Sequence, residues 1–128
     1  MDEFPNPEND HEKHRDQGEY RAVNPRMIDT EARERFRTRV LEWAAKLDVK
    51  AHAIYIRPMR RKWASCSTAG TLSFNDELLA LDRELGDYVI VHELLHFSVP
   101  NHGKLWKSLM RAHLGDWETM QARLNSFK

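Results

Sequence analysis

One short apolar stretch limits what this chain can fold into more than any other feature. Residues 88–97 read Tyr-Val-Ile-Val-His-Glu-Leu-Leu-His-Phe, so His92, Glu93 and His96 interrupt a run of large apolar side chains. Such a run predicts a helix that is buried on nearly all sides. Two imidazoles and a carboxylate inside a buried helix are costly unless a partner satisfies them. The stretch therefore predicts a functional site within the core.

The spacing of these polar residues indicates what the partner is. His92 and His96 are four residues apart, which puts both imidazoles on one helix face. Glu93 lies about 100° round the helix from His92. A divalent cation on the imidazoles, with the carboxylate hydrogen-bonded to a bound water, satisfies all three groups. Pro100 ends the helix, and the turn that follows could bring His102 to the same metal.

Zinc suits this donor set, because catalytic zinc sites use three protein ligands and keep one position for water. The expected metal ligands are therefore His92, His96 and His102, with nickel or manganese as alternative occupants. Zinc lowers the pKa of its water toward ~7 and polarises a carbonyl, and Glu93 is the expected catalytic general base. This histidine and glutamate spacing on a helix is typical of zinc metalloproteases, although a structural zinc would use the same histidines.

The remainder of the chain predicts one α+β domain over residues 26–128, preceded by a disordered acidic tail over residues 1–25. Residues 1–20 hold seven acids and two bases, a net charge of −5, and few large apolar groups. A first helix should begin at Asp29 or Thr30, with an apolar stripe that runs through Phe36 and Val40. Its arginines, Arg33, Arg35, Arg37 and Arg39, are best explained as a solvated face.

After this helix the pattern predicts a small three-stranded sheet and then helices. The expected strands are residues 51–57, 63–68 and 71–74, with Ala69-Gly70 joining the last two. Asn75 should cap a helix, Gly86-Asp87 should restart the chain, and further helices are expected at residues 88–99, 103–113 and 116–127.

Composition points to a cytoplasmic location. The single cysteine, Cys66, excludes an intramolecular disulfide, so a reducing compartment is the default. The acidic N-terminus has no apolar run typical of a signal peptide, and no apolar stretch is long enough to span a membrane. Formal charge is zero over 128 residues, which is far from the basic balance of a dedicated nucleic-acid binder.

Four linked motifs resemble the YgjP-like metallopeptidase domain, which is related to the SprT-like and WLM zinc peptidases. In order, they are Trp63-Ala64-Ser65-Cys66-Ser67, Leu72-Ser73-Phe74-Asn75 with Leu78, residues 88–96, and Asn101-His102-Gly103-Lys104-Leu105-Trp106. The resemblance covers about residues 36–114. It implies a minimal zincin-like fold, a peptide or protein substrate, zinc on His92, His96 and His102, and Glu93 as the catalytic base. Ala64 departs from the glycine that the family usually has there.

Other functions remain open from the sequence. Some relatives have been linked to nucleotide hydrolysis, so a zinc-dependent nucleotide phosphohydrolase is one alternative. A non-catalytic, zinc-stabilised binding module is another. A basic cluster, which consists of Arg57, Arg60, Arg61 and Lys62, is best explained as a solvated loop, and otherwise as a clamp for a phosphate or nucleic acid.

Several further residues are expected to have structural roles. Trp63, Cys66, Trp106 and Met110 should lie in the core, although Cys66 as a fourth metal ligand would make the site purely structural. Residues 72–74 could offer a free strand edge to an extended peptide.

Overall fold

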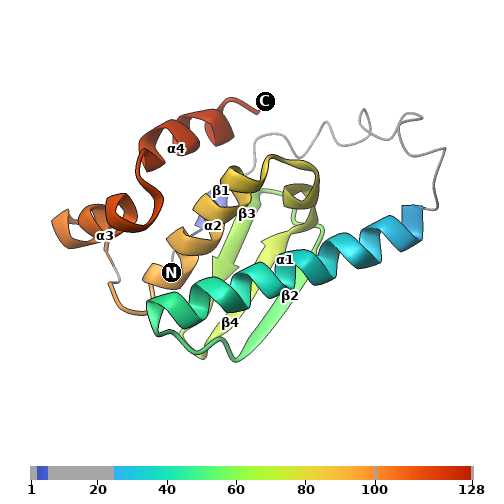
Figure 1. The fold of residues 1–128 in the computed structure, drawn as a ribbon, viewed down its shortest axis with the longest axis horizontal. Helices are drawn as coiled ribbons and strands as arrows, with labels where there is room; N and C mark the ends of the chain where they lie inside the picture. The colour runs from blue at the N-terminus through green and yellow to red at the C-terminus, as the bar shows by residue number, and fades with distance from the viewer. Residues whose placement is uncertain (1–2, 6–24, 100, 128) are drawn as a thin grey trace.

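The computed structural model describes residues 3–5, 25–99 and 101–127, which form an α+β domain as predicted. The elements are, in order, β1 (Glu3–Pro5), α1 (Pro25–Leu47), β2 (Ala53–Arg57), β3 (Lys62–Cys66), β4 (Thr71–Asn75), the 3-10 helix η3 (Asp76–Ala80), α2 (Arg83–Leu95), α3 (Lys104–Leu114) and α4 (Trp117–Asn125). Figure 1 shows α1 and α2 crossing the sheet side by side, with α3 and α4 beyond α2.

Helix α1 covers the sheet through the predicted stripe. Phe36 and Val40 are buried, at 2% and 0% exposed, and the Phe36 ring meets Phe74 of β4 edge-on with centroids 5.3 Å apart. The helix begins at Pro25 rather than at Asp29 or Thr30. A proline is tolerated in the first helical turn, because its missing N–H would have no acceptor within the helix.

The arginines of α1 were predicted to form a solvated face, and this is wrong for Arg33 and Arg39, which contact other elements of the domain. Arg33 donates to the backbone carbonyl of Ile56 and pairs with Asp76 at 3.2 Å. Arg39 donates to Asp87 of α2 at 2.8 Å. These residues join α1 to β2, η3 and α2, whereas Arg35 is exposed as predicted.

The sheet has the strand order β1-β3-β4-β2. The three predicted strands are confirmed, with bounds shifted by at most two residues, as β2, β3 and β4. Strand β2 runs parallel to β4, while β3 is antiparallel to it. Gly70 turns the chain between β3 and β4 with a φ of 93°, a conformation that favours glycine.

A fourth strand, β1, was not predicted, and it pairs antiparallel with β3. It lies within residues 1–25, which were expected to be a disordered tail, so that expectation is wrong for Glu3–Pro5. Residues 6–24 lie outside the described residues, and the predicted division of the chain into a tail and a domain stays a prediction.

Helix α2 begins five residues before the predicted start at residue 88 and ends at Leu95. The sequence suggested that Gly86 and Asp87 restart the chain, but both lie inside this helix. Gly86 is where α1 and α2 approach closely, since a Cβ there would lie 3.2 Å from the Phe36 ring and 2.9 Å from the Arg39 guanidinium. A glycine in the helix thus serves packing rather than a turn.

Asn75 caps a helix as predicted, and that helix is η3. Its side-chain oxygen accepts from the Glu77 N–H at 2.9 Å, while its amide donates to the carbonyls of Met59 and Lys62 at 2.9 Å each. The predicted helices at residues 103–113 and 116–127 are confirmed as α3 and α4, within two residues of the expected bounds. Both pack against α2.

Candidate metal centre

Helix α2 carries two of the predicted ligands and the predicted base. His92 is 2% exposed and Glu93 is fully buried, among apolar neighbours that include Val91 and Leu94, both at 0%. The helix is therefore buried on nearly all sides, as its sequence predicts. His96 follows the last helical residue, Leu95, and its backbone still has helical angles, so it stays on the same face as His92.

The chain then turns back and brings His102 to this face. Backbone N–H groups of residues 96–98 donate to carbonyls three residues earlier, at 3.0 to 3.2 Å, as the last turn of α2 tightens. The Asn101 side chain accepts from the Gly103 N–H at 2.9 Å and closes a tight turn around His102. Gly103 is the N-cap of α3. The predicted return of His102 toward the other histidines is confirmed.

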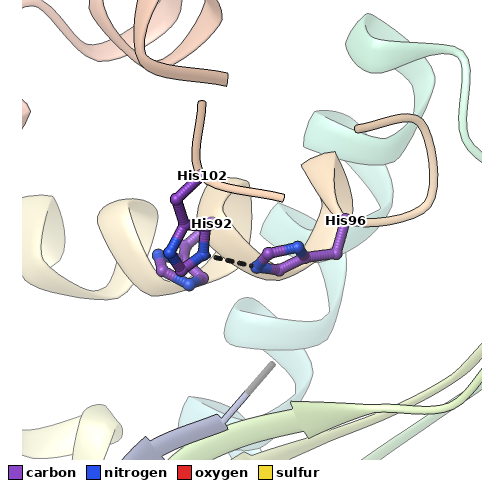
Figure 2. Close-up of side chains that lie close together, drawn as sticks. All are labelled: His92, His96 and His102. Carbon is purple, nitrogen blue, oxygen red and sulfur yellow. Dashed lines mark hydrogen bonds between the residues drawn. The ribbon is translucent and has the colours of Figure 1, made fainter. Parts of the chain in front are cut away.

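Three imidazoles converge at this point (Figure 2). One ring nitrogen from each of His92, His96 and His102 lies within 4.8 Å of the others. The Nε2 atoms of His96 and His102 are 3.0 Å apart. Convergent imidazole nitrogens at such distances fit a metal site, since imidazole is a good ligand for divalent transition metals.

An indole packs against all three imidazoles. The centroid of the Trp106 ring lies 4.4 Å from that of His102, 5.0 Å from that of His92 and 6.3 Å from that of His96. Trp106 is 2% exposed, and Met110 is fully buried, so both belong to the core as predicted. The contact of Trp106 with the histidines was missed. Two features could have indicated it: Trp106 stands four residues after His102, in the first turn of α3, and both residues belong to the same motif.

Other residues singled out in the sequence lie outside this cluster. Cys66 is buried and is not part of the group of potential metal ligands among the described residues, and Trp63 is buried against Phe127. The basic cluster lies at the connection between β2 and β3, with Arg60 and Arg61 exposed. The prediction that residues 72–74 offer a free strand edge to a peptide is wrong, because β4 lies between β3 and β2 and pairs with both.

The sequence model of the YgjP-like, metallopeptidase domain family matches residues 5–127 of this chain. The chain belongs to this family. This YgjP-like domain is therefore a metallopeptidase, which makes it a hydrolase that acts on peptides or proteins, and the resemblance inferred from the four motifs is confirmed.

Known proteins similar to this YgjP-like domain include the uncharacterized protein MJ0123 of Methanocaldococcus jannaschii. It is 36% identical over 75 residues, which are 56% of this chain and 68% of that protein. The crystal structure of the metallopeptidase zymogen of jannalysin, from the same organism, has a TM-score of 0.64 and 29% identity, and the match covers 70% of this chain and 92% of that chain.

The crystal structure of the metallopeptidase zymogen of Pyrococcus abyssi abylysin is similar in fold, with a TM-score of 0.62. It is 19% identical, over 70% of this chain and 90% of that chain. As for membranes, none of the helices in the described ranges is both long and apolar enough to cross one.

Proposed function

We propose that His92, His96 and His102 bind one zinc ion and that Glu93 acts as the general base in peptide-bond hydrolysis. The observation that carries this proposal is the convergence of three imidazole nitrogens within 4.8 Å. The buried carboxylate of Glu93 follows one of these histidines, His92, directly in the sequence. Family membership supplies the peptidase activity in general, while the zinc, its ligands and the base are specific to the proposal.

The donor set fits zinc. Zinc–nitrogen bonds are about 2.0–2.1 Å long, so tetrahedral geometry places two ligand nitrogens about 3.3 Å apart. The 3.0 Å between the Nε2 atoms of His96 and His102 is close to this value. Three protein ligands also match the number found in catalytic zinc sites, which keep a fourth position for water or substrate.

When bound, zinc supplies a Lewis acid that polarises the attacking water and the scissile carbonyl. Glu93 then accepts a proton from that water at a carboxylate oxygen as the water oxygen bonds to the carbonyl carbon. The same carboxyl group donates the proton to the amine nitrogen as the C–N bond breaks. Because α2 is buried on nearly all sides, its backbone holds Glu93 and His92 in fixed relation.

The test begins with metal content. Elemental mass spectrometry on the wild-type chain should give close to one zinc per chain, and His102→Ala should lose it. Peptide hydrolysis should fall by about 10²–10⁴-fold in Glu93→Gln while zinc content is retained, because removal of a general base has effects of this size.

Glu84→Gln is the matched control, since Glu84 is an exposed residue in the first turn of α2. It should leave hydrolysis unchanged. Equal activity in the wild type and in Glu93→Gln would rule out the role proposed for Glu93. Zinc retained with no hydrolysis of any peptide would favour the zinc-stabilised binding module, and assays with nucleotides in the same series test the phosphohydrolase alternative.

A further inference from the structure

The three histidines are held in different ways. His92 is part of α2, and His96 continues it, so the core fixes their backbones. His102 belongs to neither helix, and its side chain is exposed. An exposed side chain on a turn has rotamer freedom that metal binding must remove, which lowers affinity. The site therefore needs something that holds His102 in place.

We infer that Trp106 is a positioning residue of the metal centre, whose indole holds His102 against His92 and His96 before the metal binds. This inference rests on the proposed zinc site. The Trp106 ring lies closest to His102, with centroids 4.4 Å apart and a tilt of 38° between the planes. It meets His92 edge-on at 5.0 Å and 78°, and it lies nearly parallel to His96 at 6.3 Å and 24°.

Trp106 is itself fixed from behind. Trp117, in the first turn of α4, meets its ring edge-on at 5.3 Å and 79°, and is 5% exposed. Trp106 also lies in the first turn of α3, directly after the turn that carries His102. Aromatic rings in these arrangements attract one another and restrict each other's rotation. A rigid indole thus connects the exposed ligand to the packing of α3 and α4.

A matched pair of variants separates positioning from ordinary core packing. Trp106→Phe and Trp63→Phe each remove one buried indole, but it is Trp106 whose ring meets the three histidines, whereas the ring of Trp63 meets Phe127. Zinc affinity, measured by competition with a chelator, should fall about 10- to 100-fold in Trp106→Phe, as is typical when a residue that orients a ligand is lost. Trp63→Phe should stay within about threefold of the wild type.

The free energy of unfolding of both metal-free variants is measured alongside. If the two variants lose similar stability and differ in zinc affinity as stated, the inference holds. Equal changes in zinc affinity, or none in either, would overturn it. The spectrum of bound cobalt gives a second readout. Displacement of His102 should alter the absorption of the cobalt complex in Trp106→Phe, whereas the absorption in Trp63→Phe should match that of the wild type.

A measurement on the metal-free wild type covers the case in which Trp106→Phe fails to fold. NMR relaxation of the His102 imidazole should report a ring as ordered as that of buried His92, whereas exposed His52 should be mobile. A His102 ring as mobile as that of His52 would overturn the inference. Absence of zinc from the wild type would contradict the proposed function instead, while the order of the His102 ring would still show whether this imidazole is held before a metal binds.

Discussion

The two helices of the metal centre, α2 and α3, differ in how deeply they are buried in the protein. In α2, every residue from Leu85 to Leu95 except Asp87 is buried. In α3, the buried residues are Trp106 and Met110, and most of the surface faces solvent. The α2 side of the site is therefore an extension of the core, whereas the α3 side depends on a few contacts. Substitutions on the two sides should accordingly have very different costs.

The largest difference in stability should come from truncating a leucine in α2 and a leucine in α3. Leu94 is fully buried in α2, and Leu105 is 61% exposed in α3. Leu94→Ala should lower the free energy of unfolding by about 2–5 kcal/mol, because it leaves a cavity in the core. Leu105→Ala should change it by less than about 0.5 kcal/mol. Denaturant unfolding of the metal-free variants measures both, and similar losses would remove the distinction.

Zinc should join the exposed α3 side of the site to the buried α2 side. At a free zinc concentration about 100 times Kd, the wild type should gain about 2.7 kcal/mol of stability, because only the folded chain has the assembled site. His102→Ala should abolish the gain, although it removes only an exposed side chain. His52→Ala, at an exposed histidine outside the cluster, is the control and should keep the full gain. The measurement is unfolding with and without zinc.

The difference in burial between α2 and α3 also explains which parts of the site could be predicted from the sequence. The histidines on α2 that we propose as metal ligands stand out because a polar residue inside a buried apolar run is costly without a partner, and the apolar stripe of α1 was equally clear in the sequence. His102 was found through the turn that follows Pro100 and through the motif around it that resembles the YgjP-like family. Both are local patterns, which is why the short-range part of the fold and the three histidines could be predicted.

What was missed depends on contacts between segments far apart in sequence. Gly86 looked like a break between two segments of the chain, because the reason for a glycine there lies on α1, where a Cβ would crowd Phe36 and Arg39. Trp106 looked like plain core, because a sequence shows the burial of a residue and not its neighbours. Strand β1 is only three residues long and pairs with β3, about sixty positions away along the chain. No local periodicity marks such a strand.

Ion pairs sharpen the comparison at a smaller scale. Asp87 of α2 accepts from the Arg39 guanidinium at 2.8 Å and from the Trp43 indole at 3.1 Å, and the side chains of Asp87 and Arg39 are each 19% exposed. Asp87→Ala should cost about 1.5–3 kcal/mol, since it removes a charge-assisted hydrogen bond and leaves Arg39 without this partner.

The matched change on the other side is Glu118→Ala. Glu118 pairs with Arg111 of α3 at 2.8 Å, but both side chains are more than half exposed, at 54% and 57%. Solvent screens such pairs, so the cost should be about 0–1 kcal/mol. Denaturant unfolding measures both variants, and a larger loss for Glu118→Ala than for Asp87→Ala would mean that the joint between α3 and α4 is the stronger one.

The smallest effect concerns pH at the start of α4. The Thr119 hydroxyl and backbone N–H donate to the Asp116 carboxylate at 2.6 and 3.3 Å, and these hydrogen bonds lower the pKa of Asp116. Because the folded pKa lies below the unfolded value, the stabilisation is present above the unfolded pKa and is lost as pH falls through the folded one. Thr119→Ala should raise the pKa of Asp116 toward its usual value, as NMR titration of the carboxyl group would report.

This titration also tests the difference between the two sides of the site. Asp116 caps the helix that carries Trp117, the residue behind Trp106. As pH falls, the protection of the first amides of α4 against hydrogen exchange, relative to the intrinsic rate at each pH, should therefore decrease before that of α2. Helix α2 is held mainly by buried apolar side chains. An unchanged Asp116 pKa in Thr119→Ala would show that these hydrogen bonds do not hold the start of α4. Simultaneous loss of protection in α2 and α4 would show that the two sides of the site do not open independently.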